Sequence, residues 1–257
     1  MRASAHRAAP VVALFAAWEL VTRAHVVDPS FLPTVSSVLA AAWELLLGGE
    51  ISGNLGISLV RTFVGLALAT SVGVLLGTAM AVSRSIAGFF GPLVAVTYSL
   101  PKSALVPLFL LWFGIGSTTD IAAVSLACLL PVLVHTYHGV HGVPKVFRWS
   151  ASAMGTPAWL VLTRVLLPAA LPSVLTGTRI ALGFSFVLTI SAEMIASTDG
   201  IGRLIFMYGE NGAYSFMFAA IGVVVVVAFV ADRLFLALMR LLLRWHEFAH
   251  HEREPGG

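Results

Sequence analysis

Long apolar stretches separated by short polar segments make up most of this chain. A membrane span needs about 20 mostly apolar residues, and six stretches approach or exceed that length. They cover residues 8–25, 56–82, 88–112, 119–141, 171–197 and 217–241. The first is the weakest, because Glu19 and Arg23 fall in its last third. The pattern predicts an all-α polytopic membrane protein with about six transmembrane helices.

A shorter helix is predicted between the first two spans, in the segment PTVSSVLAAAWELLLGGE (residues 33–50). Thr34 can cap it, and a Gly-Gly pair follows its last apolar residues. The helix is amphipathic and too short to cross a bilayer, so we expect it to lie at the membrane interface. We therefore divide the chain into an anchor helix with an interfacial helix (1–55), a transmembrane domain (56–245) and a cytoplasmic tail (246–257).

Composition agrees with this pattern. The chain is 58% hydrophobic and 11% charged, whereas a soluble domain is about 45–50% apolar and about 25% charged. Such a protein exposes apolar side chains to lipid as well as to its own interior. The single Cys128 excludes an internal disulfide. No small-residue cleavage site follows the apolar run that ends at Trp18, so we expect an anchor helix rather than a removed signal peptide.

The placement of basic residues predicts the orientation. With a cytoplasmic N-terminus, the inner segments hold ten basic residues and the outer segments hold two, Arg23 and Arg203. Cytoplasmic loops carry an excess of Lys and Arg. We therefore expect both termini, and the long polar loop at residues 142–170, on the cytoplasmic side. The ten inner residues are Arg2, Arg7, Arg84, Lys145, Arg148, Arg164, Arg233, Arg240, Arg244 and Arg253.

Small residues recur every four positions along the second span. The repeat consists of Gly65, Ala69, Gly73, Gly77 and Ala81, which share one face of a helix. Lipid tails give helices no hydrophobic reason to associate, so close backbone approach through small residues supplies the contact. This ridge predicts a helix-packing face and carries no chemistry of its own.

The 142–170 loop contains no apolar stretch long enough to cross a membrane. A first short helix can end at Gly155, because glycine tolerates the left-handed turn at a helix end. Thr156 can cap a second helix that has Pro157 at its first position. We expect that second helix to end before Pro168, so that two short helices lie along the membrane surface.

This loop resembles that of the inner-membrane permease subunits of bacterial ABC importers. Their loop reads E-A-A, three residues, Gly, nine residues and I-x-L-P. The matching positions here are Ala151, Gly155, Val165, Leu167 and Pro168. Trp149 and Ser150 stand in place of the Glu and the first Ala, which is a departure from the pattern.

Three further stretches extend the resemblance to the subgroup that imports nitrate, sulfonates, taurine and related compounds. They are SLPKSALVPLFLLWFGIG (99–116), LLPAALPSVLTGTRIALG (166–183) and AEMIASTDGIGRLI (192–205), and LLRW near the C-terminus adds to them. The resemblance implies a type I importer fold with a coupling helix in the 142–170 loop. It implies a permease for a small organic or inorganic anion of the sulfonate, taurine, nitrate or bicarbonate class, in the bacterial cytoplasmic membrane.

The resemblance also implies partners. They are two copies of an ATP-binding subunit that holds ATP and Mg²⁺, a second permease copy in a homodimer, an extracytoplasmic solute-binding protein, and membrane lipid. The chain itself lacks a P-loop, because that motif needs Lys after Gly and Lys102 and Lys145 each follow Pro. We expect no catalytic residue, cofactor, metal site or nucleic-acid partner in this chain.

Two rival functions come from other classes. A secondary transporter driven by an ion gradient usually shows inverted repeats, and no such repeat is visible in the sequence. A zinc-dependent membrane protease would use His246, Glu247 and His250 of HEFAH, which match H-E-x-x-H. That motif lies seven residues from the end, in a segment that is predicted to be a solvated tail.

Histidines at 135, 138 and 141 lie at the end of the fourth span. They spread over about 120° of a helix, which favours interfacial and capping roles near the helix C-terminus over a metal or pH-sensing site.

Four ionisable residues fall within spans, where a charge costs about 2.5–3.5 kcal/mol at the centre. Lys102 lies between Pro101 and Pro107, which can break the third span, and our hypothesis is that it lines an anion path. Glu193 is expected to pair with a cation of the bundle, and Arg61 is the proposed partner. With Arg179, these residues form the predicted translocation path: Lys102, Arg61, Glu193 and Arg179.

Overall fold

The computed structural model describes residues 2–28 and 30–244. Every regular element in these ranges is helical, so the predicted all-α polytopic class is confirmed. The helices are α1 (Arg2–Arg23), α2 (Val35–Leu47), α3 (Glu50–Val82), α4 (Arg84–Tyr98), α5 (Val106–Phe113), α6 (Ser117–His141), α7 (Lys145–Ala153), α8 (Ala158–Val161), α9 (Leu167–Ala196), α10 (Ile201–Glu210) and α11 (Tyr214–Leu242). A 3₁₀ turn (Lys102–Leu105) precedes α5, and a π turn (Leu162–Leu166) joins α8 to α9.

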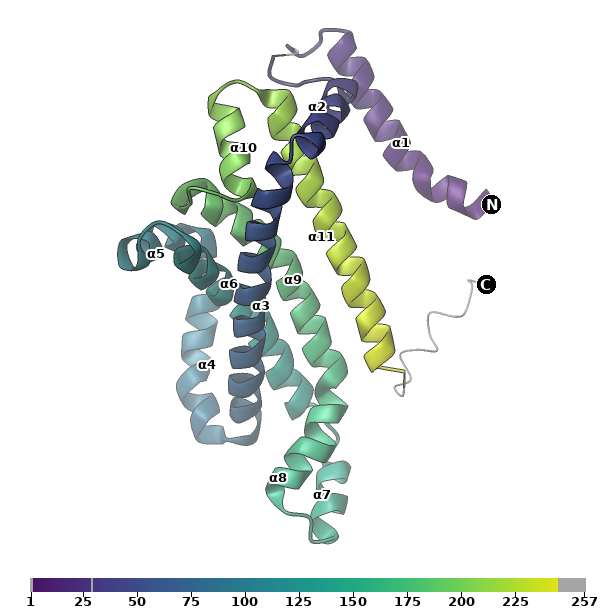
Figure 1. Cartoon of the computed structure of the whole chain (residues 1–257). Coiled ribbons are helices and arrows are strands. Elements are labelled where there is room, and N and C mark those ends of the chain that lie inside the picture. Colours follow the sequence, from purple (N-terminus) through teal and green to yellow (C-terminus); the bar gives the residue numbers. More distant parts are fainter. Residues whose placement is uncertain (1, 29, 245–257) are drawn as a thin grey trace.

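Helices α3, α6 and α9 pack side by side as the centre of the bundle (Figure 1). The small-residue ridge of α3 faces α6. A Cβ added at Gly65 would lie 2.7 Å from Cγ1 of Val124, and one at Gly77 would lie 2.6 Å from the carbonyl oxygen of Leu133. Ala69, between them, is buried. The two backbones approach so closely that a larger side chain would separate them.

The number of candidate spans is smaller than six when it is judged by length and composition. Among the described residues, α3, α6, the continuous segment from α8 to α9, and α11 qualify, and α4 with α5 makes a fifth if the two are one span. Helix α1 is 22 residues long and carries charged residues near both ends, and it is not among the qualifying helices. Its role as a membrane anchor stays a prediction.

The third predicted span (88–112) is broken, as its prolines Pro101 and Pro107 allow. The chain bends by 97° between α4 and the segment Lys102–Phe113, so that α5 runs across the bundle (Figure 1). Pro101 explains the break, because proline has no N–H to continue the helix and its ring clashes with the preceding turn. The bend leaves the last carbonyls of α4 without helical partners, and such groups are tolerated only where another donor or a cavity meets them.

The two ends of the bundle differ. Helices α2 and α10 and the start of α11 gather at one end, together with the end of α1 (Figure 1). There Ala41 and Leu45 of α2 pack into a buried cluster with Ile201 and Ile205 of α10. Thr34 caps α2 by accepting from the N–H of Ser37, as the sequence predicts. Helices α7 and α8 form the opposite end (Figure 1).

Candidate functional site

The 142–170 loop projects beyond the ends of α3 and α4 (Figure 1). Helix α7 ends at Ala153, and Gly155 then adopts φ of +73°, a conformation that glycine reaches without strain. Ala151 points inward and is buried in a cluster with Val161, Leu166 and other residues. The glycine therefore turns the chain back, while Ala151 fixes α7 against the helix that follows.

Two details of the predicted loop are wrong. Thr156 does not cap the second helix, because Pro157 occupies the N-cap position and no side chain caps the helix. The second helix also does not end before Pro168. It continues through the π turn into α9, and Pro168 is the second residue of α9, directly after the π turn.

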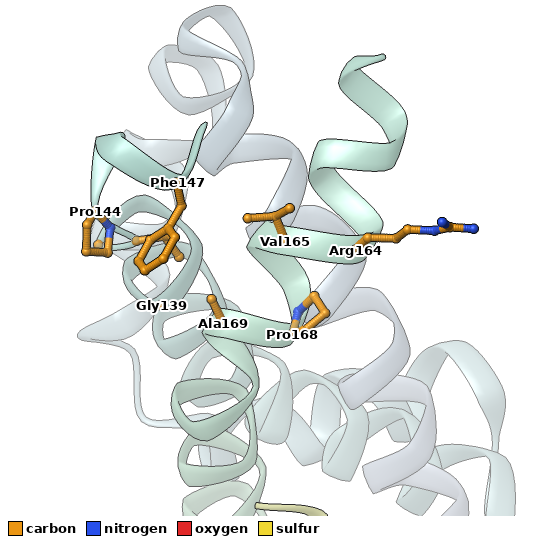
Figure 2. A pocket seen from close by; sticks show the side chains of 9 residues that line it. Gly139, Pro144, Phe147, Arg164, Val165, Pro168 and Ala169 are labelled. Atoms are coloured by element: carbon orange, nitrogen blue, oxygen red, sulfur yellow. The ribbon is translucent and has the colours of Figure 1, made fainter. Parts of the chain in front are cut away.

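A cavity of about 500 Å³ lies between α7 and the start of α9. Figure 2 shows Pro144 and Phe147 on one side of it, and Val165, Pro168 and Ala169 on the other. The side chain of Arg164 extends away from the cavity (Figure 2). The cavity is therefore mainly apolar, and it lies beside the end of the π turn, where Arg164 and Val165 line it. Such turns occur frequently at functional sites.

Near the other end of the bundle, four charged residues meet. We name Arg61, Asp120, Glu193 and Asp199 the ionic cluster. Nη1 of Arg61 lies 3.0 Å from Oε1 of Glu193 and 3.2 Å from Oδ2 of Asp120, and Nη2 contacts Asp199. The side chain of Arg61 is 3% exposed and those of Asp120 and Glu193 are fully buried. The structure thus joins Arg61 to Glu193, the pair that the sequence suggests.

Hydrogen bonds from neighbouring groups surround Glu193. Ser58 of α3 donates to its carboxylate at 2.7 Å, and the N–H of Gly202 donates at 2.9 Å. Ser58 in turn accepts from the N–H of Ile201 at 2.9 Å. Charge-assisted hydrogen bonds of this kind are about twice as strong as neutral ones. The network ties α3 to α9 and to the first turn of α10.

Sequence reasoning missed Asp120 and Asp199. Asp120 lies in the first turn of α6 and accepts from the hydroxyl of Ser197, while Asp199 lies in the turn before α10. The only signal was a carboxylate at the edge of a span, and that signal does not show which cation it meets. One guanidinium therefore faces three carboxylates, of which only Asp199, 47% exposed, reaches solvent.

Lys102 and Arg179 do not join the ionic cluster. Nζ of Lys102 donates to the carbonyl oxygen of Tyr98 at 2.6 Å, so it satisfies one of the carbonyls that the bend after α4 exposes. Arg179 of α9 forms a bidentate pair with Asp232 of α11, at 2.7 and 3.1 Å. A translocation role for Lys102, Arg61, Glu193 or Arg179 stays a prediction.

The histidines are spread as expected on α6. Nδ1 of His135 lies 2.9 Å from the carbonyl oxygen of Pro131, and the ring of His141 stacks on Tyr137 at 5.6 Å between centroids. No group of three possible metal ligands occurs among the described residues. The HEFAH motif (246–250) lies outside the described residues.

Comparisons with known proteins agree on one kind of protein. The model of the family described as the binding-protein-dependent transport system inner membrane component matches residues 69–244. The taurine transport system permease protein of Escherichia coli strain K12 is 34% identical over 91% of this chain and 86% of its own length. A putative aliphatic sulfonates transport permease protein of Bacillus subtilis strain 168 is 30% identical over 90% of this chain and 84% of its own length.

A solved structure shares the fold. It is a chain of the MetNI methionine ABC transporter in an inward-facing conformation, with a TM-score of 0.66 at 18% identity, over 76% of this chain and 97% of that one. At this identity the likeness shows the arrangement of the helices alone.

Proposed function

This chain belongs to the family of binding-protein-dependent transport system inner membrane components, and from that premise we propose that it is the permease subunit of an ATP-driven importer for a small organic sulfonate. The permease function rests on the family match over most of the chain. The substrate class rests on two relatives that are named for taurine and aliphatic sulfonates. A sulfonate fits the wider class of small anions that the sequence suggests.

We further propose that two ATP-binding subunits, a second copy of this chain and an external solute-binding protein complete the transporter. With both termini in the cytoplasm, the 142–170 loop faces the ATP-binding subunits and the ionic cluster lies toward the outside. ATP and Mg²⁺ bind to the partner subunit. The chain contributes no covalent chemistry, and it transmits nucleotide-driven motion through α7 and α8 to α9.

The packing of the loop against the bundle is the observation that carries this mechanism. Ala151 of α7 and Val161 of α8 share a buried cluster with Val140 of α6 and Ala170 of α9, and the chain runs from α8 through the π turn into α9. A displacement of α7 and α8 is therefore transmitted directly to α9. The ionic cluster ties the far part of α9 to α3 and α6, so displacement of one helix is shared by the three.

Transport by the purified complex tests the proposal. The permease, its co-purified ATP-binding subunit and the solute-binding protein are reconstituted into liposomes, and uptake of labelled taurine is measured with and without ATP inside. ATP-dependent uptake that also requires the binding protein supports the proposal. Uptake that an ion gradient drives without ATP supports the rival secondary transporter, and ATP-dependent uptake of nitrate but not of any sulfonate refutes the substrate class.

A further inference from the structure

Large apolar side chains are exposed on α7, on α8 and in the turn between them. They are Val146, Phe147, Trp149, Met154 and Trp159, each between 53% and 76% exposed. Val146, Trp149 and Ala153 follow the i, i+3, i+7 spacing of one helix face. Clusters of exposed apolar side chains mark contact sites for other molecules.

The charges of this loop have one sign. Lys145, Arg148 and Arg164 are its only ionisable residues, and no Asp or Glu occurs between residues 142 and 170. All three basic residues are exposed. At the position where the family pattern has an acidic residue, the chain places Trp149, which is 66% exposed. A partner subunit therefore cannot form an ion pair with a carboxylate of this loop.

We propose that the ATP-binding subunit of this transporter holds α7 in an apolar groove with an acidic rim, and that Trp149 is the central anchor of that contact. The inference rests on the proposed function, which supplies the partner, and adds the chemistry by which the partner is recognised. An amphipathic helix that lays its apolar face into a groove is a common recognition mode. Tryptophan and arginine are enriched among the residues that dominate interface affinity.

Position in the fold favours a soluble partner over the membrane surface. Helices α7 and α8 extend past the ends of α3 and α4 (Figure 1), and α7 is held there by Ala151, which is buried against α8 and the π turn. A rigid helix in that place meets the cytoplasm before it meets lipid headgroups. The same charges also select the partner, because a groove with a basic rim would repel Lys145 and Arg148.

Affinity of the ATP-binding subunit for the whole permease in lipid nanodiscs tests the proposal. Replacing Trp149→Ala removes a hot-spot side chain, whose loss costs 2 kcal/mol or more, so Kd should rise by about thirtyfold. Trp149→Phe should recover much of that loss. Trp43→Ala is the matched control, because Trp43 is also 66% exposed but lies on α2 at the other end of the bundle.

Charge reversal tests the acidic rim separately. Arg148→Glu should weaken binding and change its salt dependence, whereas Arg203→Glu on α10 should change neither. Elution of each variant at the wild-type volume shows that the permease is still folded.

Three results would overturn the proposal. The first two are binding of the ATP-binding subunit by Trp149→Ala as tightly as by wild type, and tighter binding by Trp149→Glu. The third is quenching by brominated lipids of the fluorescence that Trp149→Phe removes, because such quenching would place the Trp149 side chain in the membrane. Failure of the wild-type chain to bind any ATP-binding subunit would instead refute the proposed function.

Discussion

Removal of Arg61 should destabilise the bundle more than removal of any exposed arginine. The guanidinium donates to Ser117, to Glu193 and to the backbone of Asp199, and it pairs with the carboxylate of Asp120 at 3.2 Å. Arg61→Ala leaves the fully buried carboxylates of Asp120 and Glu193 without their cation. Breaking a buried pair by removing one partner costs about 3–5 kcal/mol, because an uncompensated charge stays buried.

That energy corresponds to a change of roughly one hundred- to several thousandfold in the unfolding equilibrium, at tenfold for every 1.4 kcal/mol. Unfolding by sodium dodecyl sulfate in mixed micelles, followed by far-ultraviolet circular dichroism, measures it. Arg179→Ala is the matched control. The pair of Arg179 with Asp232 is 42% and 33% exposed, so solvent screens it, and its loss should cost less than about 1 kcal/mol.

A second set of variants tests the reason for the loss. Glu193→Gln combined with Asp120→Asn, placed on Arg61→Ala, removes both stranded charges and should restore part of the lost stability. The reasoning is refuted if Arg61→Ala costs no more than Arg179→Ala, or if neutralising the two carboxylates makes the Arg61→Ala protein less stable still.

Three other variants test particular backbones and side chains. Gly77→Ala should cost about 1–3 kcal/mol, because the new Cβ would lie 2.6 Å from a carbonyl oxygen of α6; the control Gly88→Ala, with nothing within 4 Å, should be neutral or stabilising in the same unfolding assay. Gly155→Ala should lower the free energy of unfolding by about 1–2 kcal/mol, because the backbone at this position is left-handed, and should reduce ATP-driven uptake. Equal uptake by Gly155→Ala and wild type would count against a rigid loop. Lys102→Met keeps the aliphatic stem but removes the donor to the carbonyl oxygen of Tyr98. If the ammonium lines an anion path, uptake in proteoliposomes should fall at constant protein level. Unchanged uptake would leave Lys102 with a helix-capping role only.

The apolar runs by themselves predict the helical class and the approximate positions of α3, α6, α9 and α11. This works because a bilayer imposes a length and a composition on each helix that crosses it. The Gly-containing ridge of α3 likewise indicates a packing face before any partner helix is known. The motif in the 142–170 loop, together with the stretches around it, indicates the family.

Only the tertiary structure decides which groups meet. Proline makes a break possible at 101, but the 97° bend depends on how α5 packs across the bundle. Thr156 is a residue type that often caps helices, yet the chain turns at Gly155 and Pro157 takes the N-cap position of α8. Arg61 meets Asp120 and Asp199 as well as Glu193 because α3, α6 and the turn before α10 converge in space. Periodicity along one helix contains no information about the distance to a side chain on another, and for this reason the ionic cluster had to come from the fold.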